Sequence, residues 1–447
     1  MFESVLVANR GEIARRIIRT VQRMGLKAVA VHSDVDRGLP FVTEADEAIE
    51  IGPAAPAQSY RNIDAVLEAA RRSRAQAVHP GYGFLAENAE FARRVERAGL
   101  VWVGPSAEVI AQMGDKISAR NLVAAAGVPV SRGTDAPVRD AAGALAAGRE
   151  IGYPVMVKAS AGGGGMGMAV AEDEAALAPQ FEKVQAFAER TFGDPAVLLE
   201  RFFPRVRHVE IQILGLADGR VVALGERDCS VQRRNQKLAE ETPSPGVTPA
   251  LRERMSSAAV QAGEAVGYRN AGTVECLVDV ESGEFVFLEM NTRLQVEHPV
   301  TEMVLGLDLV EQQLLVAAGK PPSVDVAALV PAGHALELRI NAEDPTRFFP
   351  GPGTVTTWEE PTGDGVRVDA GYCAGTTVTP HYDSLMAKLV VHAPDRDQAL
   401  ERARAAVAAF RVEGPKVNLP FFAALLGDDE FVSGRYDTGI VARMQKR

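Results

Sequence analysis

Residues 154–171 read PVMVKASAGGGGMGMAVA: a strand-like run, a stretch of glycines and a second strand-like run. Gly162, Gly164 and Gly167 match the G-x-G-x-x-G spacing of a dinucleotide-binding turn. In that turn the last glycine opens a helix, whereas the residues after Gly167 favour a strand. A Walker A loop is excluded too, because its lysine follows the glycines and Lys158 precedes them. The stretch therefore predicts a glycine-rich hairpin whose backbone N–H groups fold over phosphates.

The composition indicates an acidic globular enzyme with more than one domain. A chain of 447 residues exceeds one ordinary hydrophobic core, so we expect about two to four domains. The net charge of −11 argues against general binding to nucleic acid or anionic membranes. The cysteines, Cys229, Cys276 and Cys373, lack metal-ligand spacing and predict reduced thiols. We find neither a leader-like N-terminal segment nor an apolar run long enough to span a bilayer, so we expect a cytoplasmic protein.

The first hundred residues alternate between strand and helix patterns. Strands are expected at 4–8, 27–33, 75–81 and 100–104, and an amphipathic helix at 12–24. This rhythm predicts a parallel sheet with helices on both faces. The first turn holds only one of the three glycines of a Rossmann fingerprint, so we expect no dinucleotide there. A helical connector at 113–130 then leads into the next domain.

A second hairpin carries paired carboxylates. The runs 273–280 and 284–291 are β-rich and are joined by Glu-Ser-Gly, which predicts a three-residue loop. Pairing Val280 with Glu284 places Glu275 opposite Glu289, and two such carboxylates repel unless a cation lies between them. Asn291 falls on the same face as Glu289, so the set suits Mg²⁺ or Mn²⁺. A register slip would break this pairing, and a plain surface hairpin is the alternative.

The next residues continue the polar pattern. Every odd position from 289 to 297 is polar: Glu289, Asn291, Arg293, Gln295 and Glu297. If the chain stays extended, these side chains line one wall of an active site. A solvated strand edge is the alternative, but such edges favour lysine and threonine over this mixture.

Eight motifs occur together and in chain order: ANRGEIA, HPGYGFLAEN, MGDK, KASAGGGGMGM, HVEIQ, ERDCSVQRRNQK, EMNTRLQVEHPVTE and RINAED. With these motifs the chain closely resembles the biotin carboxylase component of the biotin-dependent carboxylases, which are ATP-grasp enzymes. The resemblance runs over essentially the whole chain. It implies a multidomain α/β fold with a Rossmann-like pre-ATP-grasp domain at 1–115 and an ATP-grasp module at 116–330. A mobile lid is expected at about 131–203, and a β-rich C-terminal domain at 331–447.

The resemblance also implies roles for individual residues. It assigns to ATP the residues Lys116, Lys158, Gly164, Gly165, Glu200, Arg201, Phe202, Phe203 and His208. Further cofactor-binding residues would be Asn235, Glu275, Glu289, Gln295 and Val296. Metal ligands would be Glu275, Glu289 and Asn291, which agrees with the hairpin argument. Lys237, Arg293 and Val296 would surround bicarbonate, Glu297 would be the general base, and Arg339 would bind biotin. His79 and His298 are expected to fix loops.

The implied reaction begins when bicarbonate attacks the γ-phosphate of ATP and Glu297 removes its proton, which gives carboxyphosphate. That intermediate would release CO₂ and phosphate inside the closed lid. The phosphate would deprotonate N1′ of biotin, and Arg339 would stabilise the enolate. Without the resemblance, His208 could be a core histidine, and Arg339 could pair with Glu343 or Asp344.

The sequence departs from the family pattern at the lid and the nucleotide site. Family members commonly carry Arg or Lys in place of Met166, and a further basic residue in place of Ala169, so the lid tip has lost positive charge. Arg201 stands where lysine is frequent, which is tolerable if the contact is through its backbone. Asn235 stands where many members have histidine. All metal, bicarbonate and biotin positions are intact.

The resemblance implies partners as well. No Met-Lys-Met biotinylation site is present, so we expect biotin on a carrier protein or domain, a carboxyltransferase partner and a homodimer. Two other functions compete. One is another ATP-grasp ligase acting on bicarbonate or a carboxylate, which Lys237 and Arg339 argue against. The other is a non-catalytic nucleotide-binding subunit with a weakened lid.

Overall fold

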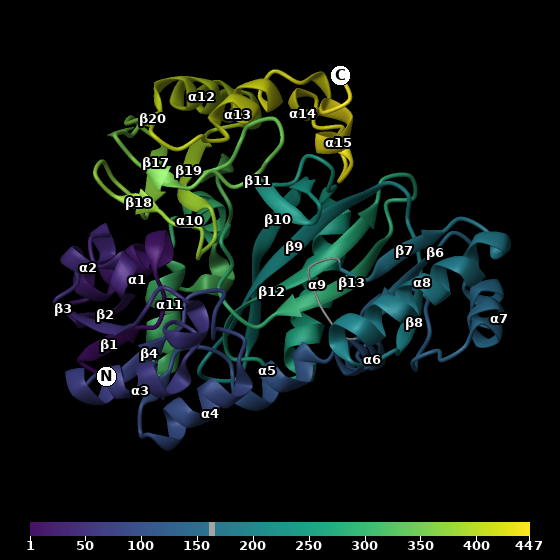
Figure 1. The fold of residues 1–447 in the computed structure, drawn as a ribbon, viewed down its shortest axis with the longest axis horizontal. Coiled ribbons are helices and arrows are strands. Elements are labelled where there is room, and N and C mark those ends of the chain that lie inside the picture. Colours follow the sequence, from purple (N-terminus) through teal and green to yellow (C-terminus); the bar gives the residue numbers. More distant parts are fainter. Residues whose placement is uncertain (161–165) are drawn as a thin grey trace.

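The computed structural model describes residues 1–160 and 166–447. Gly164 and Gly165 lie outside these residues, as does the expected contact of their N–H groups with phosphate. Among the described residues, no helix is both long and apolar enough to cross a membrane. Figure 1 shows an N-terminal sheet and a lid at opposite ends of a large central sheet, with the C-terminal helices above that sheet.

The N-terminal region is the predicted parallel sheet, in the order β3-β2-β1-β4-β5. Its strands are β1 (Ser4–Val7), β2 (Lys27–Ser33), β3 (Glu47–Gly52), β4 (Ala77–His79) and β5 (Val101–Trp102). Its helices are α1 (Gly11–Arg23), α2 (Pro40–Glu44), α3 (Ile63–Ser73) and α4 (Ala89–Arg97). Along β1, Val5 and Val7 pack in one core with Ile17 of α1, while Leu6 packs in another with Val66 of α3. This alternation confirms that helices cover both faces.

The connector after this sheet is two helices instead of one. They are α5 (Ala107–Gly114) and α6 (Lys116–Ala125). Between them, the side chain of Asp115 accepts a hydrogen bond from the Ser118 N–H at 2.7 Å and caps α6. This cap places Lys116 at the first position of α6, where it lines the central cavity described below.

The lid has its own sheet and its own core. It comprises β6 (Val155–Ala159), β7 (Met168–Ala171), β8 (Val197–Arg201), α7 (Ala141–Ile151) and α8 (Glu174–Phe192). β6 pairs antiparallel with β7 from Val155–Ala171 to Lys158–Met168. The strand–glycine–strand hairpin is therefore confirmed, and no helix opens at Gly167. Phe181 of α8 is buried against this sheet together with Val157 and Leu199.

The central sheet has eight strands in the order β13-β12-β9-β10-β11-β14-β19-β17. They are β9 (Val206–Gly215), β10 (Val221–Arg233), β11 (Gln236–Thr242), β12 (Asn270–Asp279), β13 (Phe285–Asn291), β14 (His334–Asn341), β17 (Val366–Ala370) and β19 (Leu385–Ala393). The helices α9 (Pro249–Ala265), α10 (His298–Leu305) and α11 (Leu309–Ala317) connect or cover it. Because β11 pairs with β14, one continuous sheet spans residues 206–393.

The remaining elements complete the C-terminal region. Two small sheets pair β15 (Gly353–Thr354) with β18 (Thr377–Val378), and β16 (Thr357–Glu359) with β20 (Arg411–Glu413). The helices are α12 (Arg396–Ala409), α13 (Leu419–Leu425), α14 (Asp429–Val432) and α15 (Ile440–Met444). Three 3₁₀ turns lie at Asp34–Asp36, Pro56–Gln58 and Val326–Ala328. A core that includes Phe422 and Leu389 joins these helices to the central sheet.

Candidate active site

A cavity of about 1020 Å³ is lined by residues from the N-terminal region, the lid and the central sheet. Sixteen of the predicted site residues line it: Lys116, Lys158, Glu200, Arg201, Phe202, Phe203, His208, Asn235, Lys237, Glu275, Glu289, Asn291, Arg293, Gln295, Val296 and Arg339. Glu297 does not line the cavity but is fully buried and bonded to two residues that do. The structure therefore brings all the described candidates together.

The central sheet places charged side chains in a row across four strands. Glu289 on β13 is the register partner of Glu275 on β12, which is the partner of Glu210 on β9. Glu210 in turn faces Arg227 on β10. Cross-strand neighbours on one face lie close enough for their side chains to interact, so the row forms a continuous charged floor.

The hairpin register agrees with the sequence prediction only near the site. Glu275 faces Glu289 as expected, but from Cys276 onward the pairing shifts by one residue, to Phe287. Leu288 is the extra residue of a β-bulge. The predicted pairing of Val280 with Glu284 is therefore wrong: Glu284 accepts from the Asp279 N–H at 2.8 Å, which leaves a four-residue loop, 280–283.

The prediction of an extended wall from 289 to 297 is also wrong, although its side chains do reach the cavity. β13 ends at Asn291, and the chain then turns into α10 at His298. Pro299 lies in the first turn of α10, where a missing N–H has no cost. Arg293, Gln295 and Val296 line the cavity from this turn, and Glu297 lies behind them at the N-terminal end of α10.

Lys237 is the centre of the most heavily charged part of the site. It follows a two-residue hairpin loop, Arg234-Asn235, in which both residues have positive φ as a type I′ turn requires. Its Nζ lies 2.6 Å from Glu210, 2.9 Å from Glu275 and 2.7 Å from Glu297. Burial opposes its charge, yet these carboxylates raise the pKa of Lys237 well above its usual value. The ammonium therefore stays charged.

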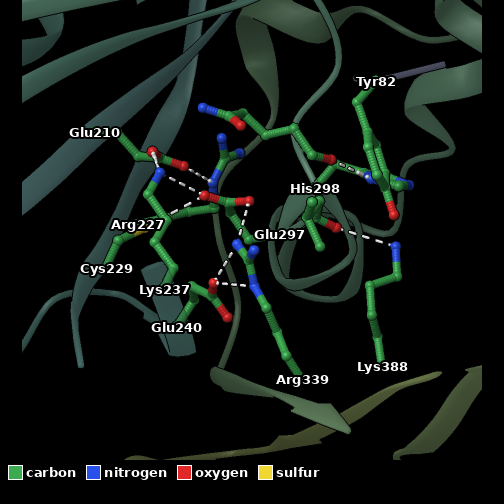
Figure 2. Close-up of polar contacts among 12 residues, drawn as sticks. Tyr82, Glu210, Arg227, Cys229, Lys237, Glu240, Glu297, His298, Arg339 and Lys388 are labelled. Carbon is green, nitrogen blue, oxygen red and sulfur yellow. Dashed lines mark hydrogen bonds and ion pairs between the residues drawn. The ribbon is translucent and has the colours of Figure 1, made fainter. Parts of the chain in front are cut away.

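Glu297 is ionised in this arrangement. Burial disfavours its charge, but Lys237, Arg339 and Arg227 hold the pKa of Glu297 well below its usual range. Arg339 donates to Glu297 at 2.9 Å and to Glu240 at 2.7 Å, as Figure 2 shows. It makes no ion pair with Glu343 or Asp344 among the described residues, so the capping alternative is not what the structure shows.

Arg293 is oriented by polar groups on both sides. It donates to Glu87 at 2.9 Å, to Asn291 at 2.9 Å and to Gln295 at 2.7 Å. Gln295 in turn donates to Glu275 at 2.9 Å. These bonds fix the guanidinium at the cavity surface.

The donors at the paired carboxylates fit a divalent metal. Burial and the facing Glu275 raise the pKa of Glu289, so the cations near Glu289 do not offset these two effects. The Glu289 side chain makes no hydrogen bond within residues 1–160 and 166–447, whereas Glu275 is held by Lys237 and His208. With the Asn291 amide oxygen nearby, the set is all oxygen, as Mg²⁺ prefers.

The nucleotide candidates gather where the lid meets the central sheet. Lys158 on β6 forms an ion pair with Glu200 on β8. Arg201 donates its guanidinium to the Tyr153 carbonyl and its backbone N–H to the Arg132 carbonyl, the latter at 2.7 Å. His208 contacts Glu275 at 3.0 Å. Burial opposes the charge of the ring, but this carboxylate outweighs burial, so the pKa of His208 is raised. His208 is therefore a site residue and not an isolated core histidine.

Sequence reasoning missed several residues that support this site. Glu210 and Gln212 follow His208 at alternate positions along the fully buried strand β9, and Arg227 donates to both. Polar residues at period two within a buried strand were the available signal. Glu240 on β11 and Glu87, within the HPGYGFLAEN motif, were missed as well.

Comparison with known proteins places this site in a family. Family models match as the biotin carboxylase N-terminal domain at residues 1–110, the carbamoyl-phosphate synthase L chain ATP-binding domain at 115–323, and the biotin carboxylase C-terminal domain at 337–443. The chain is 49% identical over 435 residues to the biotin carboxylase of Pseudomonas aeruginosa, covering 97% of this chain and 96% of that one.

Solved structures agree. A biotin carboxylase from Campylobacter jejuni, solved as a β-γ-ATP complex, is 41% identical with a TM-score of 0.95, covering 99% of both chains. The biotin carboxylase domain dimer of the Hydrogenobacter thermophilus 2-oxoglutarate carboxylase, solved with MgADP, ADP and bicarbonate, is 43% identical with a TM-score of 0.93. It covers 99% of this chain and 98% of that one. The three domain matches and these full-length likenesses show that this chain belongs to the biotin carboxylase family.

Proposed function

We propose that this chain uses ATP and bicarbonate to carboxylate N1′ of biotin. One observation carries the proposal: a single cavity is lined both by an opposed carboxylate pair, Glu275 and Glu289, and by three cations. The cations are Lys237, Arg293 and Arg339. The carboxylates suit a nucleotide-bound metal, and the cations suit a small oxyanion. Few other reactions need a metal site and an oxyanion site within one pocket.

The first step joins two anions, so the site must neutralise them. Lys237 and Arg293 orient bicarbonate at the cavity surface, while Lys116 and Lys158 approach the phosphates. Bound at Glu275, Glu289 and Asn291, Mg²⁺ would supply charge neutralisation for the phosphates. Each such charged contact lowers the barrier by about 2–4 kcal/mol, by analogy with oxyanion-hole deletions.

Glu297 enters the reaction as a carboxylate and therefore accepts a proton. An oxygen of bicarbonate attacks the γ-phosphorus, the bond to ADP breaks, and the bicarbonate proton passes to Glu297. The bicarbonate anion shares Lys237 with Glu297, which weakens the hold of this ammonium on the carboxylate and raises the proton affinity of Glu297. The products are carboxyphosphate and ADP.

The second step uses Arg339. Carboxyphosphate releases CO₂ and phosphate, and the phosphate takes the N1′ proton of biotin. The Arg339 guanidinium, held by Glu240 and Glu297, stabilises the enolate oxygen of the ureido ring. N1′ then attacks CO₂ to form carboxybiotin.

Several finer points belong to the same proposal. Biotin would arrive on a carrier protein or domain, a carboxyltransferase would take the carboxyl group onward, and two copies of this chain would form a homodimer. Fatty acid synthesis through an acyl-CoA carboxylase, Mn²⁺ as an alternative metal and a cytoplasmic location stay predictions. So do the domain boundaries at 115/116 and 330/331 and the individual residue roles.

The deciding assay measures bicarbonate-dependent ADP release with and without free biotin. We expect slow release with ATP, magnesium and bicarbonate, and clear stimulation by biotin. A rate that does not respond to biotin would favour another ATP-grasp ligase. No ATP turnover at all would favour a non-catalytic nucleotide-binding subunit.

A further inference from the structure

The turn that carries Val296 into the cavity is held from behind by two side chains outside the predicted site. Lys388 on β19 donates its Nζ to the Val296 carbonyl at 3.0 Å. His298, the first residue of α10, bonds the Gln295 carbonyl through Nδ1 at 2.8 Å. Figure 2 shows His298 and Lys388 to the right of Glu297.

These two bonds determine where the adjacent N–H groups point. In a trans peptide the carbonyl and the following N–H point in opposite directions, and the only cis bonds in the described residues are at Pro154 and Pro243. The N–H groups of Val296 and Glu297 therefore face away from Lys388 and His298. Neither donates to any residue that the structure describes, and Val296 lines the cavity. Two successive free N–H groups form an anion-binding nest.

Lys388 is suited to this task by its burial and its charge. Its side chain is 0% exposed, and it lies on β19 between its register partners Arg339 on β14 and Asp369 on β17. Its ammonium forms an ion pair with Glu12 of α1 at 3.1 Å. A hydrogen bond from a buried charged donor is stronger than a neutral one. The bond therefore fixes the turn firmly against the C-terminal part of the sheet.

His298 supplies a weaker second support. A carbonyl can only accept, so Nδ1 must carry the proton. Burial and the neighbouring cations Lys388 and Arg16 lower the pKa of His298 well below its usual value, so the ring is neutral. Its other nitrogen, Nε2, has no hydrogen-bond partner in the described residues.

We propose that Lys388, assisted by His298, is a positioning residue that holds residues 295–297 so that the N–H groups of Val296 and Glu297 bind the bicarbonate oxyanion. Lys388 is not among the residues that line the cavity and acts only through the backbone. The inference rests on the proposed function. It means that bicarbonate binding requires Lys388, which lies in the C-terminal part of the sheet.

The test is Lys388→Met, which keeps the length of the side chain and removes the donor. We expect the KM for bicarbonate to rise about tenfold to a hundredfold, as when a hydrogen bond to a charged group is lost. The KM for ATP should stay within about twofold, because ATP binds at the lid. Hydrogen exchange should also show that bicarbonate, added with MgADP, no longer protects residues 292–300.

A matched control removes a partly buried cation elsewhere. Arg396 on α12 binds Glu241 at 2.7 Å and lies outside the cavity lining. Arg396→Met should lower the melting temperature and leave both KM values within about twofold of wild type. If Lys388→Met does not fold, His298→Leu and His298→Asn form a second pair. Leucine should raise the KM for bicarbonate, whereas asparagine, which keeps an N–H donor, should not.

The outcomes separate this inference from the function beneath it. Wild-type protein without bicarbonate-dependent ADP release overturns the proposed function. Active wild-type protein with an unchanged KM for bicarbonate in Lys388→Met overturns only the positioning role. Equal rises in the two KM values would also overturn it, because they indicate general damage.

Discussion

The two sides of the cavity are built in opposite ways. On the central sheet Lys237 is only 11% exposed and contacts three carboxylates, while Arg293 and Arg339 are each held by two or more acceptors. On the lid, Lys158 has a single ionic partner among the residues that the structure describes, and Met166 and Met168 are 58% and 39% exposed. The central sheet holds its charged side chains in place before any ligand arrives, whereas the lid holds few charged side chains in place.

This difference indicates where catalysis and where closure reside. Charges fixed in a dry site stabilise a transition state without reorganisation during the reaction. A lid has to open and close, so tightly paired charges there would hold it in one state. Changes on the sheet should therefore cost rate, and changes on the lid should mainly alter nucleotide affinity.

Glu297→Gln should have the largest effect, because it removes the proton acceptor and keeps the shape of the side chain. We expect bicarbonate-dependent ADP release to fall about 100- to 10,000-fold. Glu240→Gln is the matched control, since Glu240 binds the same guanidinium but, unlike Glu297, makes no hydrogen bond to Lys237 among the described residues. Its loss in rate should be much smaller. A Glu297→Gln rate within tenfold of wild type would place the base elsewhere.

Arg339→Ala separates the two halves of the reaction. Biotin-dependent turnover should fall by about 100- to 1000-fold, since the enolate loses its charged donor. Bicarbonate-dependent ADP release without biotin should persist, because Lys237 and Arg293 still hold bicarbonate. Steady-state assays with and without biotin measure both. A parallel loss of the two activities would contradict the biotin-binding role.

Much of this sheet-and-lid contrast was visible in the sequence, because local patterns carry it. The run of glycines between two strands predicted the lid hairpin, and alternation along a hairpin predicted that Glu275 faces Glu289. The bulge at Leu288 was not predictable from alternation. Leu288 is simply one more apolar residue within a β-rich run, and only the pairing with β12 reveals it.

The supporting network was hidden for a different reason. Lys388 and Val296 lie 92 residues apart in the chain, and Arg227 lies 74 residues from its acceptor Thr301. No local pattern relates such positions, and their meeting depends on the order of strands in the sheet. The prediction that residues 289–297 form one extended wall was wrong because a local pattern misled. The alternation of polar residues continues to Glu297, although the strand ends at Asn291.

The sheet side should also show a stability that depends on pH. Glu241 on β11 is buried against His334, Arg396 and Tyr436. Burial opposes its charge, but His334 and Arg396 lower the pKa of Glu241 from 4.5 to about 2. A carboxyl group whose pKa is lowered by folding stabilises the folded state at pH values above its unfolded pKa. This stabilisation is lost as the pH falls towards its folded pKa. The contribution is on the order of 3 kcal/mol at neutral pH.

Glu241→Gln should therefore lower the free energy of unfolding at pH 7. The gap from wild type should shrink between about pH 5 and pH 2. Denaturant unfolding at several pH values measures it, and Glu430→Gln, at a partly exposed pair with Arg443, is the matched control. A gap that stays constant across this range would mean that Glu241 does not contribute through its charge.

The smallest effect is expected on the lid. Met166 is exposed next to β7 and lines a small cavity of about 70 Å³ together with Lys158 and Glu289. Met166→Arg would add a cation that faces the phosphates across solvent, where charge pairs are weak. The KM for ATP should therefore fall only about two- to fivefold, with kcat unchanged. Ala186→Arg, at an exposed position on α8, adds the same single charge away from the cavity and is the matched control. An unchanged KM would mean that this lid closes over ATP through its backbone and gave up no contact at Met166.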